Sequence, residues 1–159
     1  MKYRMVIWGG ILTSSTVMVL GPSGFGATFA GSNHAAVSIN IAENRKSEGQ
    51  AWYASGGIDG RGKLETIWLV DVAGSSSTPR IVHIDSKFTN AEGTGSFIIR
   101  RNLISAPISG SSRSFETGTW CITWATGVYL EMRGQGIVAG ADKAGVVGDS
   151  LYGVTWFAK

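Results

Sequence analysis

Apolar and polar residues alternate in short segments along most of the chain, from Ala35 to Ala158. A period of two is typical of β-strands with one buried face, and no helical period lasts longer than two turns in this part. Eight strands are expected, at 35–42, 50–58, 63–73, 80–89, 95–104 and 150–158, with two more between 115 and 141. Eight sequential strands joined by short turns favour an up-and-down antiparallel barrel, with a β-sandwich as the alternative.

The stretch 120–142 favours the barrel. Trp120 and Trp124 share one face of its first strand. Gly134 and Gly136 share one face of the next strand, where missing side chains allow a neighbouring backbone to approach closely or the strand to coil sharply. A small closed barrel must bend its strands in this way.

The same stretch contains the sequence TGVYLEMRGQG, which resembles the signature of the allene oxide cyclase-like barrel proteins, a family that includes small exported bacterial members. Related glycine patterns occur in dirigent proteins, which share that barrel. The matching positions are Thr126, Gly127, Tyr129, Arg133, Gly134 and Gly136, whereas Ala125 and Met132 depart from the pattern. The resemblance implies an all-β, calycin-like barrel of eight strands. Catalytic groups in such barrels line the lumen and differ between subfamilies, so the resemblance transfers no catalytic residue.

The N-terminal segment predicts export. Lys2 and Arg4 precede a mostly apolar run, Met5–Leu20, and small residues follow. This order is typical of a secretory signal peptide. An uncleaved membrane anchor is the alternative, but the run is too short to span a bilayer. We therefore expect residues 1–30 to be removed and residues 31–159 to form one barrel domain, either periplasmic or secreted.

Charge and composition exclude several kinds of partner. The chain has 14 basic and 11 acidic residues, and removal of Lys2 and Arg4 leaves 12 against 11, a mature charge near +1. This balance argues against nucleic acid, and no later segment is apolar enough to span a membrane. The single cysteine, Cys121, cannot form an intramolecular disulfide. The two histidines are far apart and give no metal-ligand spacing, so no metal or cofactor is expected.

Five residues are predicted to line a ligand site if the barrel is hollow: Trp68, Phe97, Arg101, Trp120 and Trp156. The four aromatic residues each fall on the more apolar face of their strand. Arg101 shares the face of Phe97, and a guanidinium on an inner face needs a carboxylate partner or an anionic ligand. Alternatively, Arg101 lies at the mouth of the barrel and reaches solvent. The tryptophans would line a pocket or simply fill the lumen.

Two outer faces are also expected. His83, Asp85 and Lys87 alternate with apolar residues, which is typical of a solvated strand face, and an acid/base site inside the lumen is the alternative. The segment 63–73 is apolar on both faces in its middle. One of these faces must point outward, and it would form a subunit interface in a dimer or trimer, unless a loop or the N-terminal segment covers it. The resembled family often forms trimers.

Three functions fit these expectations. The first is an exported barrel that binds a small apolar or aromatic molecule in its lumen, which the many aromatic residues favour. The second is a cyclase or isomerase of the allene oxide cyclase-like type, acting on a lipid or polyketide-like substrate; catalysis that mainly confines a substrate leaves little trace in a sequence. The third is a structural protein with a filled barrel. The volume of the lumen distinguishes the third function from the first two.

Overall fold

The structure, a computed structural model, describes residues 17–20, 26–29, 34–44, 50–72, 78–143 and 146–158. The chain divides into two units, Met1–Asn33 and His34–Lys159. In the first unit, β1 (Val17–Leu20) pairs antiparallel with β2 (Gly26–Phe29). Most of the predicted signal peptide lies outside the described residues, so export and cleavage stay predictions.

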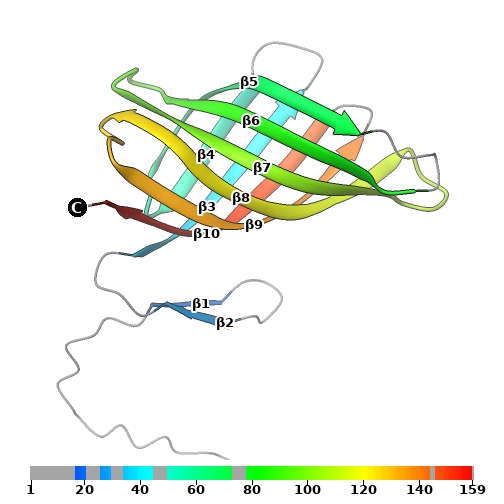
Figure 1. The fold of residues 1–159 in the computed structure, drawn as a ribbon, viewed down its shortest axis with the longest axis horizontal. Helices are drawn as coiled ribbons and strands as arrows, with labels where there is room; N and C mark the ends of the chain where they lie inside the picture. Colours follow the sequence, from blue (N-terminus) through cyan, green and yellow to red (C-terminus); the bar gives the residue numbers. More distant parts are fainter. Residues whose placement is uncertain are drawn as a thin grey trace, which may run out of the picture. The chain divides into compact units, whose positions relative to one another are not determined.

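The second unit is a closed barrel of eight antiparallel strands (Figure 1). The strands are β3 (Ala35–Asn44), β4 (Gln50–Gly56), β5 (Gly60–Val72), β6 (Arg80–Asn90), β7 (Gly95–Pro107), β8 (Arg113–Gly127), β9 (Met132–Lys143) and β10 (Val146–Phe157). Each strand pairs with the next, and β10 pairs with β3 to close the ring. The predicted up-and-down barrel is confirmed. In the described parts of the chain, no helix is long and apolar enough to cross a membrane.

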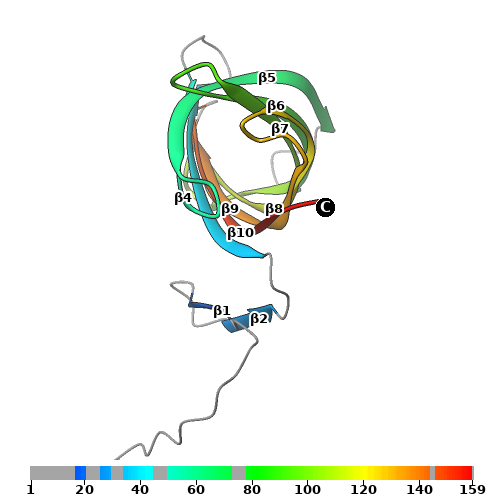
Figure 2. The same cartoon turned by 90° about the vertical axis from the view of Figure 1, so that its left-hand side faces the viewer.

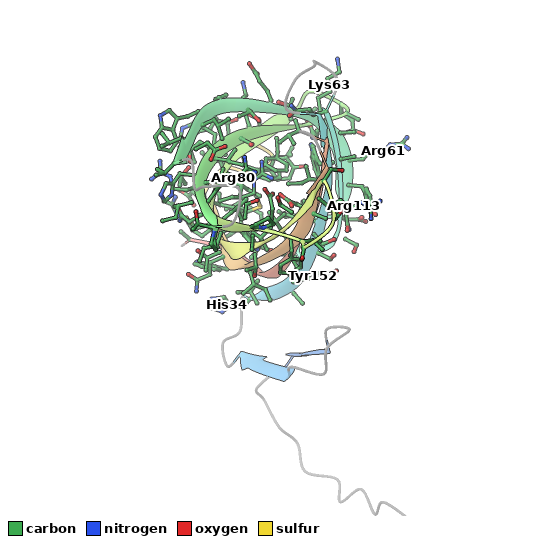
Figure 3. All side chains as sticks on the ribbon, turned by 90° about the vertical axis from the view of Figure 1, so that its right-hand side faces the viewer. His34, Arg61, Lys63, Arg80, Arg113 and Tyr152 are labelled. Carbon is green, nitrogen blue, oxygen red and sulfur yellow. The ribbon has the colours of Figure 1, made fainter. Side chains whose placement is uncertain are left out.

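The two ends of the barrel differ in their connections. At one end, short turns at 57–59, 91–94 and 128–131 join β4 to β5, β6 to β7 and β8 to β9. We call this the tight-turn end, and Figure 2 looks toward it. β5 and β7 end, and β6 and β8 begin, at the opposite end, which Figure 3 faces.

Aromatic rings fill the barrel toward the tight-turn end. Phe88 and Phe97 are opposite each other on β6 and β7, and their rings stack with centroids 5.1 Å apart. The edge of Trp52 meets both rings, at 5.9 and 5.5 Å. Its indole nitrogen donates hydrogen bonds to the carbonyl oxygens of Lys63 and Thr89, 3.1 and 3.2 Å away. An indole can be buried here because its polar N–H group finds backbone partners.

A second large ring, that of Trp120 on β8, lies across three glycines, two on β9 and one on β10. A Cβ atom added to Gly134 would come within 3.1 Å of this ring, and one added to Gly136 or Gly153 within 2.6 or 2.8 Å. The Trp120 indole nitrogen donates a hydrogen bond to the carbonyl oxygen of Tyr152, 3.2 Å away. The glycine pair predicted to permit close approach therefore makes room for one tryptophan side chain as well as for the neighbouring backbone.

Candidate ligand-binding site

Charged side chains lie inside the barrel between its two ends. Arg101 of β7 donates a hydrogen bond from Nη1 to Oδ2 of Asp149 on β10, over 2.7 Å. Its Nη2 donates to the hydroxyl of Ser86, 3.0 Å away. Both members of the ion pair have side chains that are 0% exposed. Glu116 of β8, also 0% exposed, pairs with Gly140 of β9, which in turn pairs with Asp149 of β10. The hydrogen-bonded ion pair offsets the cost of burying these charges.

Further polar groups follow toward the opposite end of the barrel. Arg80 pairs with Ser105 in the register of β6 and β7, and Ser105 pairs with Glu116 across β7 and β8. The guanidinium of Arg80 donates to Asp71, 3.1 Å away, and to the Ser105 hydroxyl, 3.3 Å away. Figure 3 labels Arg80 at this end. The inner face thus changes from aromatic to charged along the barrel axis.

Three of the five predicted site residues lie inside the barrel. Phe97 and Arg101 are 0% exposed and Trp120 is 2% exposed. The expectation that Arg101 points inward and needs a partner is met by Asp149, and the alternative that it reaches solvent is wrong. These three side chains have almost no surface left for a ligand to touch.

Trp68 was expected on the inner face, and its position is a correction. The register of β5 and β6 pairs Thr66 with Ser86 and then Trp68 with Asp85, so a β-bulge leaves Ile67 as an extra residue. An extra residue reverses the facing of every residue beyond it. Leu64, before the bulge, is buried, whereas Trp68, after it, points outward and is 47% exposed.

Trp156 was expected on the inner face and also lies on the outer one. Asp149, Leu151 and Thr155 of β10 are buried, as is Val154. Gly153 pairs with Gly136, which pairs with the buried Trp120, so the inner face carries the odd-numbered positions. The Trp156 ring packs against His34, with centroids 4.9 Å apart. The face of β10 with the larger side chains is the outer one, because the inner face needs Gly153 to accommodate the ring of Trp120.

The predicted solvated face of β6 is confirmed. Arg100 of β7 holds the carboxylate of Asp85 with two hydrogen bonds, of 2.9 and 2.7 Å. His83 Nδ1 lies 2.7 Å from the side-chain oxygen of Asn102. These contacts join neighbouring strands on the outer surface, so His83 and Asp85 do not form an acid/base site in the lumen.

A cleft of about 540 Å³ lies at the tight-turn end. It is lined by residues from all three tight turns and the strands beside them: Tyr53, Asp59, Gly60, Arg61, Asn90, Glu92, Val128 and Tyr129. The register pairs Tyr53 with Arg61 across β4 and β5. Clefts of this size are typical of sites for small organic molecules.

Tyr129 forms the boundary between this cleft and the packed aromatic rings. Its ring meets Phe97 edge to face, with centroids 5.0 Å apart. Burial raises the pKa of its phenol, a hydrogen bond with the Asn90 side chain lowers it, and the negative charge of Glu92 raises it further. Asn90 is held in turn by Thr94, whose hydroxyl accepts its amide hydrogen over 2.8 Å. The half-buried phenol therefore has fixed surroundings at the base of the cleft.

Sequence reasoning missed this cleft. Asp59, Gly60 and Arg61 fall between two expected strands, where the sequence indicates only a turn, and Tyr129 enters only as part of the glycine-rich signature. Each turn was predictable by itself, but their convergence depends on the closure of the barrel. The available signal was the concentration of chemistry-bearing residues in turns rather than strands.

No protein-family model, no curated protein and no solved structure matches this chain. The resemblance to allene oxide cyclase-like and dirigent proteins therefore stays an expectation from the sequence. Among the described residues, no three His, Cys, Asp or Glu side chains are grouped so that they could hold a metal ion.

The outer face of β5, β6 and β7 carries an apolar strip. Val72 pairs with Ile81, which in turn pairs with Ile104, and all three are about half exposed. Trp68 and Val70 extend the strip along β5. An exposed apolar strip of this kind marks an interaction surface more often than an ordinary solvated sheet does.

Proposed function

We propose that this chain is an exported binding protein that holds a small, partly aromatic molecule in the cleft at the tight-turn end. The cleft itself carries the proposal, because it combines a volume of about 540 Å³ with two tyrosine rings and several polar groups. Such a combination is common in small-molecule sites, where apolar walls give affinity and a few polar groups fix orientation.

The cleft supports the proposal better than the lumen does. Phe88, Phe97 and Ile84 on the inner face are 0% exposed, so no water-sized space adjoins them. A ligand in the middle of the barrel would have to displace packed rings or the ion pair of Arg101 and Asp149. By contrast, Tyr53 and Val128 in the cleft are 62% and 60% exposed and can contact a ligand without any rearrangement.

Two matched variants in one turn test the proposal. Val128 lines the cleft, whereas Leu130, which is 63% exposed in the same turn, does not. Saturation-transfer NMR with a set of small aromatic compounds should detect binding to the parent protein and to Leu130→Trp. Val128→Trp should lose that binding because its indole fills the cleft. Equal binding by both variants, or none by the parent, would contradict the proposal.

A cyclase or isomerase of the allene oxide cyclase-like type is the second candidate. The buried charged groups favour it, since Arg101, Asp149 and Glu116 could act on a lipid or polyketide-like substrate that entered the barrel. Such an enzyme would have to open from the end where Arg80 lies. Turnover of an unsaturated epoxide or a polyketide by the purified protein, and its loss in Glu116→Gln, would support this candidate. Absence of turnover with both substrate classes would favour the binding protein.

We also propose that a second copy of the chain covers the apolar strip on β5, β6 and β7. The contiguous row formed by Val72, Ile81 and Ile104 supports this. Analytical ultracentrifugation should show a dimer or trimer for the parent and a monomer for Ile81→Asp. A monomeric parent would contradict the proposal, whereas the cleft, at the end of the barrel, does not depend on it.

A further inference from the structure

The cleft at the tight-turn end has more negative than positive side chains. Its charged lining residues are Asp59, Glu92 and Arg61, so its formal charge is −1, from two carboxylates and one guanidinium. The barrel as a whole is close to neutral without the N-terminal segment, so this charge is local to the cleft. An opposite charge on a ligand would be favoured there.

Both aromatic residues of the cleft are suited to contact with a positive charge. Tyr53 and Tyr129 line it from β4 and from the turn after β8. The face of a tyrosine ring carries partial negative charge and attracts a cation that lies within about 6 Å of it. The carboxylate of Glu92 lies near the Tyr129 ring, since its negative charge contributes to the raised pKa of the Tyr129 phenol.

Gly60 leaves room for a ligand beside Tyr129. A Cβ atom at this position would lie 3.8 Å from the Trp52 ring and 3.9 Å from the Tyr129 hydroxyl, with no closer contact. The missing side chain therefore opens the space next to the phenol.

We propose that the cleft binds a small, soluble organic cation, such as one with a quaternary ammonium group; this rests on the proposed function, that the cleft is a ligand site. The apolar methyl groups of such a cation contact the tyrosine rings, and Asp59 and Glu92 balance its charge without the strong desolvation that a bare ammonium would require. Arg61, beside Tyr53, opposes the cation and limits its affinity.

Two probes of the same shape, one charged and one neutral, show how much of the affinity depends on charge. Choline carries a quaternary ammonium group, and 3,3-dimethyl-1-butanol has the same outline without the charge. In NMR titrations of the whole protein at low salt, choline should bind about fivefold more tightly or better than the alcohol. Added salt should reduce the difference because it screens the carboxylates.

Substitution of the charged lining residues gives a second, independent test, because the direction of each change in choline affinity is predicted. Asp59→Asn and Glu92→Gln should each weaken choline binding about threefold, and Arg61→Gln should strengthen it by a similar factor. Binding of the neutral alcohol should not change. Glu65→Gln is the control, because Glu65 is an exposed acid on β5 that does not line the cleft.

Each result decides the proposal. Tighter binding of choline with these signs supports it. Equal binding of the two probes, or an Arg61→Gln variant that loses choline while Asp59→Asn gains it, overturns the cation and leaves the cleft as a ligand site. If neither probe binds while an aromatic compound does, the cation is again overturned alone. If nothing binds in the cleft, the proposed function fails with it.

Discussion

Arg101 and Asp149 form an ion pair across the interior of the barrel, from β7 to β10, with 2.7 Å between Nη1 and Oδ2. The two strands are not neighbours in the ring, since β8 and β9 lie between them. The pair therefore links side chains that no backbone hydrogen bond of the sheet connects. Each charge offsets part of the cost of burying the other.

Removal of one charge from this pair should strongly destabilise the barrel. Arg101→Gln should lower the free energy of unfolding by about 3–5 kcal/mol, because it leaves a carboxylate buried without its main cation. Arg100→Gln is the matched control: its guanidinium is 48% exposed on the outer surface, so the variant should unfold at nearly the same urea concentration as the parent. Urea unfolding curves of the two variants measure the difference, and equal midpoints would contradict the buried role of Arg101.

The Arg101–Asp149 coupling should also appear in a double-mutant cycle. Arg101→Gln combined with Asp149→Asn should cost less than the sum of the two single substitutions by about 1–3 kcal/mol, because each single variant keeps one charge of the pair and the double variant removes both. Strictly additive losses would show that the two residues act independently.

The glycines beneath Trp120 should tolerate no side chain. Gly136→Ala should reduce stability by about 1–3 kcal/mol or more, because its Cβ would collide with the carbonyl oxygen of Tyr152 and lie 2.6 Å from the Trp120 indole nitrogen. Gly148→Ala should be nearly neutral, since a Cβ atom there meets nothing within 4 Å. Thermal melts compare the two. A Gly136→Ala variant as stable as Gly148→Ala would show that β9 and Trp120 do not approach each other closely.

Two tryptophans on opposite faces should behave differently. Trp120→Leu should cost about 2–4 kcal/mol through lost packing inside the barrel. Trp68→Leu should change stability by less than about 0.5 kcal/mol, because its ring is 47% exposed on the outer face. Chemical denaturation measures both, and a large loss for Trp68→Leu in the monomer would place this ring inside after all.

The phenol of Tyr129 should make the barrel less stable at high pH. Burial raises its pKa above the ordinary value of 10.0, so the folded state keeps a proton that the unfolded chain releases. Stability is therefore unaffected by this group below pH 10 and falls as the pH rises through and above that value. Melting temperatures between pH 9 and 11 should fall less steeply in Tyr129→Phe than in the parent. Parallel curves would contradict the shift.

The fold was predictable from the sequence because alternation sets the strands and the turns are short. The facing of β6 and β7 followed directly from this pattern, as Val82, Ile84 and Phe97 are all 0% exposed. The facing of Trp68 was not predictable, since one extra residue at Ile67 reverses the pattern and both faces of that segment are apolar. The pattern of apolar residues cannot reveal a β-bulge in a strand whose two faces are both apolar.

The site was less predictable than the fold. The sequence left open whether Arg101 is buried inside the barrel or reaches solvent at its mouth. Its partner Asp149 is 48 residues away and belongs to a strand that no short-range pattern connects to it. Trp156 was predicted on the inner face because it lies on the face of β10 with the larger side chains. The inner face of β10 carries smaller side chains, since Gly153 makes room there for the ring of Trp120 on β8. The cleft residues Tyr53, Asp59 and Tyr129 come from β4 and two separate turns, and only the closed ring brings them together.

The most direct test of the account is an NMR titration of the labelled parent protein with a small aromatic ligand found by saturation transfer. The account predicts shifts of the backbone amides of Gly60, Asn90 and Val128, which line the cleft. The indole N–H signal of Trp120, buried in the barrel, should stay in place. Shifts centred on Trp120 and Arg101, with the cleft amides unchanged, would mean that the ligand enters the lumen and would contradict the account.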